Sequence, residues 1–280
     1  MESYVQNGTT LAAHFGGIRQ LGYVVADLDA TIDEWRRRKG IGPWTIMRNV
    51  CLNAVYRGAP SRPLIDIALA YSGDVQIELI QQRNDAPSPY RARIQAHRYG
   101  LHHFAFLCAD IADDVRRAES LGWQVVCDIR MPGSGRYVYL QSARFGDDFH
   151  IEFLEASPVM RRIFAVGMAE TASARNAETL EFDLASWASK LKQGAWMCGL
   201  PLRRHAVASP VPPVRHPQLD RLEYMVPDLT AAIDAWQMQL GICPWQRATG
   251  RAEARSGAVV LTLVESGSNL SRGSNSCATS

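Results

Sequence analysis

The stretch QLGYVVADLDATIDEWRRRKGIGPW at residues 20–44 decides the fold, because it returns later in the chain as RLEYMVPDLTAAIDAWQMQLGICPW at residues 221–245. About half of the aligned positions are identical, far more than chance gives for unrelated segments. Residues 103–123, HFAFLCADIADDVRRAESLGW, form a fainter copy. Each copy predicts a short alternating strand, an Asp at a helix N-cap position and a helix of about three turns. The chain is therefore expected to consist of repeated modules.

The segments that follow the first two copies are rich in strand signals. Each contains three apolar stretches that are separated by glycine and proline residues. Each unit is therefore predicted to be a β-α-β-β-β module, one over residues 17–82 and the other over 101–156. A sheet of three or four strands with one helix cannot bury both of its faces alone. We expect an α+β fold in which the two modules pair to form a cupped mixed sheet, with a partial third module.

The rest of the chain has a less regular pattern. Residues 1–16 form an N-terminal extension to a paired-module domain over 17–170. Residues 171–215 are predicted to be a helical and Pro-rich linker, with ETLEFDLASWASKLKQ as one of its helical stretches. Residues 216–266 form the partial third module, because little room is left there for two strands between the helix and the last strand. The low-complexity residues 267–280 are expected to be disordered.

Composition limits the classes of partner. The formal net charge is only +2, and the longest basic run, Arg36 to Lys39, ends a predicted helix, where cations suit the helix dipole. We therefore expect no nucleic-acid partner. Six scattered cysteines without a C-x-x-C pair indicate reduced thiols. No stretch approaches the roughly 20 apolar residues that span a bilayer, and the N-terminus lacks a signal-peptide pattern. A cytoplasmic protein without a membrane partner is the expectation.

Two adjacent histidines begin the stretch GLHHFAFLCAD at residues 100–110. Adjacent strand residues point to opposite faces, so only one of the two can face the cleft. Phe104 shares a face with His102 and suits packing on the helix of the module. That leaves His103 for the cleft, and the repeat places Gln20 at the equivalent position. His102 is expected to be structural, so His102→Ala should reduce stability and leave a metal bound at His103 in place.

The last strands of the two modules, VQIELI and HIEFLE, carry Glu78 and Glu152 at equivalent positions. An ionised carboxylate within an apolar strand is costly unless it is paired or binds a cation. Together with the two cleft positions they predict one metal site, formed by Gln20, Glu78, His103 and Glu152. The alternative is a salt bridge from either glutamate to Arg130, Arg136 or Arg144.

These motifs, together with PGSGRYVYL and SPYRARI, resemble the vicinal oxygen chelate superfamily, which includes glyoxalase I, methylmalonyl-CoA epimerase, extradiol dioxygenases and bleomycin-resistance proteins. The resemblance covers residues 17–170 well and 216–266 partially. It implies a cupped sheet that binds one divalent metal ion (Zn, Co, Ni, Mn or Fe) through the first and last strands of each module. Carried onto this sequence, the ligands are the same four residues, a set similar to that of eukaryotic-type glyoxalase I.

The sequence also departs from these relatives. Val24 and Gln82 stand where the resemblance to glyoxalase I would place an Arg and an Asn that hold glutathione, so glutathione recognition is not expected. Gln20 stands where dioxygenase members have a histidine ligand, which argues against oxygen chemistry. In the third module Arg221 and Thr262 occupy the ligand positions, so this module is predicted to be free of metal.

The resemblance implies a metal-dependent isomerase or lyase, acyl-CoA epimerase-like or glyoxalase-like, that acts on a carbon next to a carbonyl. Glu152 is the first choice for the catalytic base and Glu78 the second. His150 and Arg136 are the candidates for binding the small-molecule carbonyl substrate, with solvent exposure as the alternative for both. Two other functions stay open: a metal-free small-molecule binding or resistance protein of the same fold, and a ring-cleaving dioxygenase. A homodimer is compatible with the sequence.

Overall fold

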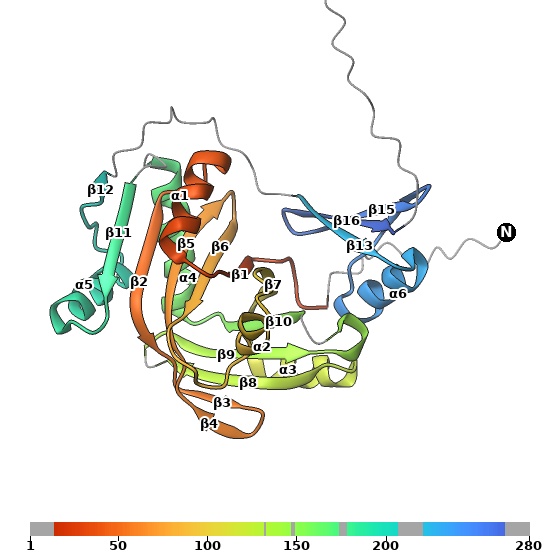
Figure 1. The fold of residues 1–280 in the computed structure, drawn as a ribbon, viewed down its shortest axis with the longest axis horizontal. Helices are drawn as coiled ribbons and strands as arrows, with labels where there is room; N and C mark the ends of the chain where they lie inside the picture. The colour runs from red at the N-terminus through yellow and green to blue at the C-terminus, as the bar shows by residue number, and fades with distance from the viewer. Residues whose placement is uncertain (1–13, 132, 147–148, 174–177, 207–220, 267–280) are drawn as a thin grey trace, which may run out of the picture.

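The computed structural model describes residues 14–131, 133–146, 149–173, 178–206 and 221–266, and its arrangement is drawn in Figure 1. The predicted tail at 267–280 and the Pro-rich segment at 209–217 lie outside the described residues. No helix in the described ranges is both long enough and apolar enough to cross a membrane.

The first module has the predicted β-α-β-β-β order with a small hairpin inserted. Its elements are β1 (Gln20–Val24), α1 (Leu28–Lys39), β2 (Trp44–Cys51), β3 (Ala54–Tyr56), β4 (Ala59–Ser61), β5 (Leu64–Ser72) and β6 (Val75–Gln82). The short helix α2 (Arg91–Gln95) leads to the second module. The second module comprises β7 (Gly100–Cys108), α3 (Ile111–Ser120), β8 (Gln124–Met131), β9 (Gly135–Gln141), the 3₁₀ helix η1 (Ala143–Phe145) and β10 (His150–Glu155).

The helix starts form as the repeat predicts. Asp27, Asp110 and Asp228 each cap a helix by accepting a hydrogen bond from a backbone N–H of its first turn. Gly40 and Gly241 end the corresponding helices in the left-handed conformation, at φ of 62° and 66°. The same start and stop signals therefore produce the same local structure in the first and third modules.

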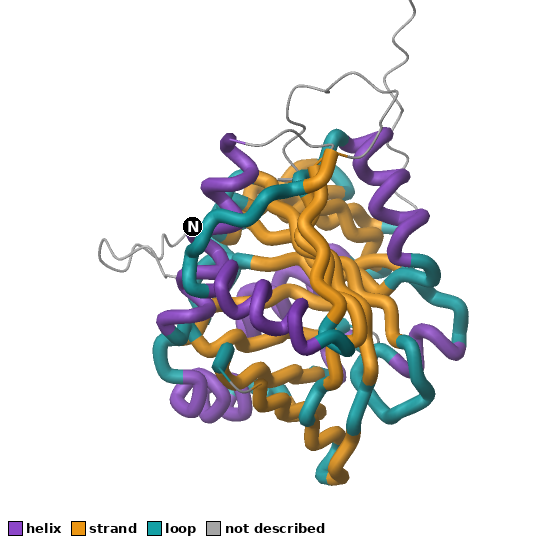
Figure 2. Tube along the Cα trace, turned by 90° about the vertical axis from the view of Figure 1, so that its left-hand side faces the viewer, coloured by secondary structure: helices purple, strands orange, loops and turns teal. Residues whose placement is uncertain are grey.

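The two modules share one curled sheet. With β11 (Glu178–Asp183) and β12 (His205–Ala206) at one edge, the strand order is β12-β11-β2-β5-β6-β1-β7-β10-β9-β8-β3-β4, and β1 and β7 pair antiparallel at the centre. In Figure 1, β2, β5 and β6 stand upright while β8 and β9 run across the bottom, so the sheet forms a half-barrel. Figure 2 shows helices flanking this strand layer. The α+β class and the cupped mixed sheet predicted from the sequence are confirmed.

The segment after the second module completes the half-barrel. It contains α4 (Pro158–Ser173), β11 (Glu178–Asp183), α5 (Trp187–Met197) and β12 (His205–Ala206). The sequence predicts helix from residue 178 onward, whereas the structure has a strand there that pairs in parallel with β2. Leu180 and Phe182 alternate with exposed neighbours and are buried, so this stretch fits the open edge of β2 better than it fits an amphipathic helix.

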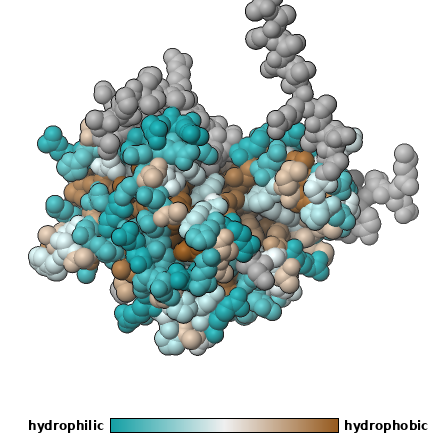
Figure 3. Space-filling view, in the orientation of Figure 1, coloured by the Kyte–Doolittle hydropathy of each residue, from teal (hydrophilic) through white to brown (hydrophobic). Residues whose placement is uncertain are grey.

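The third module is more complete than the sequence analysis expects. It contains β13 (Arg221–Val226), α6 (Leu229–Leu240), β14 (Gln246–Ala248), β15 (Arg251–Ser256) and β16 (Val259–Glu265), which form a separate four-stranded sheet. The Trp236 ring of α6 lies 5.9 Å from the Phe104 ring of β7, and the Trp123 indole N–H donates to the Gln239 carbonyl. This module therefore packs on the convex side of the half-barrel. The surface in Figure 3 is mainly hydrophilic, with apolar side chains scattered between.

Candidate metal centre and cavity

The pairing of β1 with β7 places the predicted ligands together. Gly22 lies opposite His103, and a Cβ atom at Gly22 would stand only 1.8 Å from the His103 ring. The ring therefore fills the space that this glycine leaves free, which brings it toward Glu78 on β6, the neighbour of Gly22 in the parallel register. On the other side, β10 pairs with β7 and supplies Glu152.

The donor atoms of three of these residues converge. His103 Nε2 lies 3.0 Å from Glu152 Oε2 and 3.6 Å from Glu78 Oε2. Among the described residues these three form the one group of His, Cys, Asp or Glu side chains close enough together to hold a metal ion. Neither carboxylate makes an ion pair with an arginine in the described ranges, so the structure does not favour the salt-bridge alternative. Separations of this size suit ligands that are each about 2.0–2.2 Å from one ion.

A chain of hydrogen bonds fixes which nitrogen of His103 faces the carboxylates. The Pro89 carbonyl, which can only accept, lies 3.1 Å from His102 Nε2, so that nitrogen donates. Burial lowers the pKa of His102 well below its ordinary value, which keeps the ring neutral and leaves its Nδ1 as an acceptor. Nδ1 of His103 lies 3.0 Å away and donates to it. The Nε2 lone pair of a neutral His103 is therefore directed at the two carboxylates, and only a cation or a proton there relieves the repulsion.

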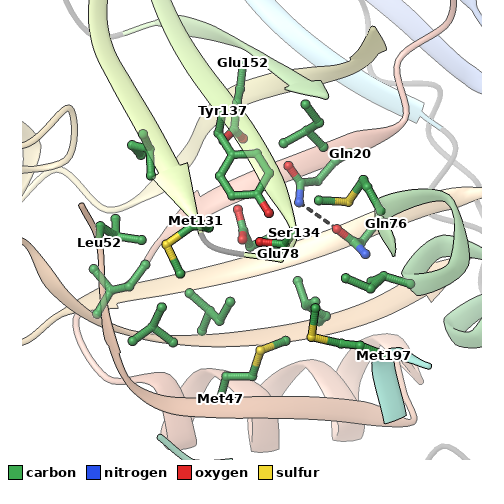
Figure 4. Close-up of a pocket in the computed structure, with 18 of the residues that line it drawn as sticks. Gln20, Met47, Leu52, Gln76, Glu78, Met131, Ser134, Tyr137, Glu152 and Met197 are labelled. Atoms are coloured by element: carbon green, nitrogen blue, oxygen red, sulfur yellow. Dashed lines mark hydrogen bonds between the residues drawn. The ribbon is translucent and has the colours of Figure 1, made fainter. Parts of the chain in front are cut away.

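A second series of hydrogen bonds orients the side chain of Gln20. The Tyr71 hydroxyl donates to the Ile163 carbonyl at 3.2 Å, so it accepts from the Gln76 amide N–H. Gln76 Oε1 then accepts from the Gln20 amide at 2.7 Å, the bond that is dashed in Figure 4. Gln20 must therefore present its oxygen elsewhere. Its Oε1 is buried and has no hydrogen-bond partner among the described residues.

The result is a set of buried acceptors without donors. Gln20 Oε1, His103 Nε2 and Glu152 Oε2 all lack a hydrogen-bond partner in the described chain. Burial, and then the neighbouring Glu152 carboxylate, raise the pKa of Glu78 well above its usual value. Buried acceptors and carboxylates are costly unless a donor or a cation satisfies them. One nitrogen and three oxygen donors suit a divalent ion of the Zn, Co, Ni, Mn or Fe type, so the residues fit the predicted metal.

A cavity of about 190 Å³ opens beside these residues, and Gln20, Glu78 and Glu152 line one end of it. Gln76, Ser134 and Tyr137 also lie at this polar end (Figure 4), and Tyr90 and Tyr139 line the cavity as well. The remaining wall is mainly aliphatic. Gln76 and Tyr137 were not predicted from the sequence to line the cavity, although strand alternation places Gln76 on the same face as Glu78.

The two predicted substrate-binding residues lie elsewhere. His150 is buried and its ring stacks on His102, with ring centroids 4.6 Å apart. The Arg136 guanidinium is paired with the Asp128 carboxylate at 2.8 Å. Neither residue lines the cavity. His102, predicted to lie on the outer face as a supporting residue, instead contacts the ring of His103.

The equivalent positions of the third module are occupied by an ion pair. The Arg221 guanidinium donates to Glu253 Oε1 at 2.5 Å and to the Thr262 hydroxyl at 3.3 Å. Arg251 also pairs with Glu253. A fixed guanidinium at the ligand position repels cations, so a metal ion is not expected in this sheet.

The stacked histidines predict that stability falls in acid. Burial lowers the pKa of His150 to about 3, and burial also lowers the pKa of His102. Unfolded histidines take up protons near pH 6.5, so the unfolded state binds more protons than the folded state below that pH. The free energy of unfolding should fall as pH drops from about 6.5 toward 3, by up to about 1.36 kcal/mol per pH unit for each histidine.

Urea unfolding of the wild type and His150→Phe at several pH values between 4.5 and 7.5 measures this effect. The variant keeps an aromatic ring in the stack, so its curve should be flatter by the contribution of one histidine. A curve parallel to the wild type would contradict the neutral, buried state of His150. His205→Phe, a substitution of an exposed histidine, is the control.

The hydrogen bonds that orient Gln20 predict different metal affinities for two substitutions of Gln76. Gln76→Leu removes the acceptor that holds the Gln20 amide, so metal affinity should fall about 10- to 100-fold, as for other residues that orient metal ligands. Gln76→Glu keeps an acceptor at that position and should retain most of the affinity. Competition with a fluorescent chelator measures both. An equal loss in the two variants would mean that Gln76 acts through packing and not through orientation of Gln20.

Comparison with known proteins gives a family match for part of the chain. Residues 19–140 match the Glyoxalase/Bleomycin resistance protein/Dioxygenase superfamily, which confirms the superfamily predicted from the sequence. No curated protein matches the chain.

Similar solved structures have low identity. Methylmalonyl-CoA epimerase from Mycobacterium tuberculosis is 20% identical over 56% of this chain and 97% of its own, with a TM-score of 0.37. A hypothetical protein from Bacillus halodurans is 18% identical over 49% of this chain and 92% of its own, with a TM-score of 0.37. A mutant of 4-hydroxymandelate synthase from Streptomyces coelicolor is 15% identical over 89% of this chain and 62% of its own, with a TM-score of 0.45.

Proposed function

We propose that this chain, whose residues 19–140 belong to the glyoxalase/bleomycin resistance/dioxygenase superfamily, is a metal-dependent isomerase or lyase that acts on a carbon next to a carbonyl. One observation carries the proposal: buried acceptor atoms of Gln20, His103 and Glu152, together with Glu78, converge without donors at the polar end of a cavity. Such an arrangement is stable only with a cation or extra protons between the acceptors.

The four residues would hold one divalent ion, with Zn, Co, Ni, Mn and Fe as the candidates. Bound there, such an ion polarises a substrate carbonyl and stabilises the negative charge that develops when the adjacent C–H loses its proton. The carbonyl oxygen of a substrate in the cavity would lie at the end lined by Gln20, Glu78 and Glu152. The hydrogen-bond chains from Pro89 and Ile163 hold the His103 ring and the Gln20 amide in place before the substrate arrives.

The proton would move between the substrate carbon and Glu152. This carboxylate lines the cavity, and its Oε2 has no hydrogen-bond partner among the described residues, so it is the first choice for the base. Glu78 lies on β6, on the other side of the central strands β1 and β7, and also lines the cavity. A proton taken by one carboxylate and returned by the other would invert the carbon, which is the isomerase reaction. Return by the same carboxylate would preserve its configuration.

Elemental analysis of protein purified without an affinity tag tests the proposal. The wild type should carry about one divalent ion per chain, and Glu152→Ala should lose most of it. The metal-loaded wild type should also exchange the α-proton of an enolisable ketone with solvent D₂O faster than the metal-free protein does.

A metal-free binding protein is the second candidate, and the mainly aliphatic wall of the cavity favours it. A binding protein of this kind should contain no stoichiometric metal and should not catalyse exchange of the α-proton. Its affinity for a ligand should not change in His103→Ala.

A further inference from the structure

We infer that the substrate of this site is an uncharged carbonyl compound with a hydrocarbon body, and not a nucleotide thioester or another anionic conjugate. The position of the carbonyl rests on the proposed function. The nature of the body rests on the cavity wall alone.

The wall offers no positive charge to an anion. In the described chain Glu78 and Glu152 are the charged residues that line the cavity, and no Lys, Arg or His side chain does so. The two carboxylates would formally cancel one divalent ion, which leaves nothing to neutralise a charged substrate group. Burying an unpaired charge is costly, so a carboxylate or phosphate on the body of the substrate would be excluded.

The far end of the cavity is mainly apolar and adaptable, and its one polar side chain among the described lining residues is the uncharged amide of Gln193, which lies 3.0 Å from Met47 Sδ. Met47, Leu52, Met131 and Met197 line it away from the carboxylates (Figure 4). Methionine side chains are flexible and polarisable, so they fit irregular apolar groups and contact aromatic rings favourably. An aliphatic or aromatic body would therefore be bound by burial of apolar surface, about 25 cal/mol per Å².

Part of this wall comes from outside the family match. Met160 and Ile163 belong to α4 and Met197 to α5, and all three line the cavity. They follow residue 140, where the match ends. The segment that carries α4 and α5 therefore closes the cup and determines which body fits. A cavity of about 190 Å³ suits a small molecule.

Isothermal titration with two matched probes tests the inference. 2-Hydroxyacetophenone carries a neutral aromatic body, and 4-(2-hydroxyacetyl)benzoate carries a carboxylate at the far end of the same ring. Metal-loaded wild type should bind the neutral probe at least about 10-fold more tightly than the carboxylate probe, because the carboxylate finds no cation. Equal affinity, or tighter binding of the carboxylate probe or of acetoacetyl-CoA, would overturn the inference.

A positive charge introduced at the far end of the cavity provides a second measurement. Met197→Lys places an ammonium group there and should reverse the preference in favour of the carboxylate probe. Met197 is the last residue of α5, where a lysine is compatible with the helix dipole. Leu191→Lys makes a similar change at an exposed position of the same helix and should leave the preference as in the wild type. An unchanged preference in folded Met197→Lys would count against the inference.

A probe without a carbonyl separates this inference from the proposed function. Ethylbenzene has the hydrocarbon body alone, so it should bind with and without metal. If ethylbenzene binds but metal does not tighten the binding of 2-hydroxyacetophenone, the proposed function fails and the inference about the body stands. If metal tightens both ketone probes and the carboxylate probe is preferred, the inference fails and the proposed function stands.

Discussion

His103→Ala should reduce bound metal from about one ion per chain to background. His103 Nε2 lies between Glu78 and Glu152, and its removal leaves two carboxylates with no nitrogen ligand among them. Loss of a residue that only orients a ligand typically costs about 10- to 100-fold in metal affinity, and loss of the ligand itself should exceed that. Elemental analysis after dialysis, with chelator competition to measure the affinity, gives the result.

Substitution of His102 should give an intermediate result. From the sequence alone His102 is expected to be a supporting residue whose loss spares the metal. The structure instead shows its Nδ1 3.0 Å from His103 Nδ1, where it selects the tautomer that directs His103 Nε2 toward the two carboxylates. His102→Phe keeps an aromatic ring but has no acceptor, so affinity should fall about 10- to 100-fold without reaching background. His205→Ala, at an exposed histidine, should have no effect. Stoichiometric metal in His103→Ala would place the metal elsewhere.

Strand alternation and the internal repeat were sufficient to predict that the four residues proposed as metal ligands lie close together. Both signals depend on local geometry: the two-residue period of a strand fixes the face, and the repeat fixes the equivalent position in the next module. The sequence therefore predicts that Gln20, Glu78, His103 and Glu152 lie together, and the structure brings them together. The inability of one module to bury its sheet alone predicts that the two modules pack together. The edge-to-edge pairing of β1 with β7, which positions these residues, is shown by the structure.

The same reasoning could not place Arg136 or His150. Alternation assigns a face, but it does not say whether a neighbouring strand supplies a partner. Asp128 on β8 pairs with Arg136, and His102 takes up the ring of His150. The part of the cavity wall that α4 and α5 form could not be predicted from the sequence either, because it depends on packing between segments that are far apart in the chain. One such contact is that of Gly167, where a Cβ atom would stand 2.0 Å from the Tyr71 ring.

Glu152→Gln should separate the role of Glu152 as a base from its role as a metal ligand. A glutamine keeps a ligating oxygen, as Gln20 does, but cannot take up a proton at neutral pH. We therefore expect the variant to retain part of its metal while exchange of the substrate α-proton falls about 10²- to 10⁴-fold, the usual contribution of a positioned general base. Nuclear magnetic resonance of 2-hydroxyacetophenone in D₂O measures the exchange rate, and elemental analysis of the same sample measures the metal.

Two further variants make this result specific. Glu119→Gln changes an exposed carboxylate on α3 and should leave both readouts as in the wild type. Glu78→Gln tests the second carboxylate with one enantiomer of 2-hydroxypropiophenone, whose reacting carbon is a stereocentre, since a residue that only returns the proton should slow formation of the opposite enantiomer more than it slows exchange. Retained exchange in metal-loaded Glu152→Gln would exclude Glu152 as the base. Loss of exchange in that variant together with complete loss of metal would contradict the expected separation of the two roles.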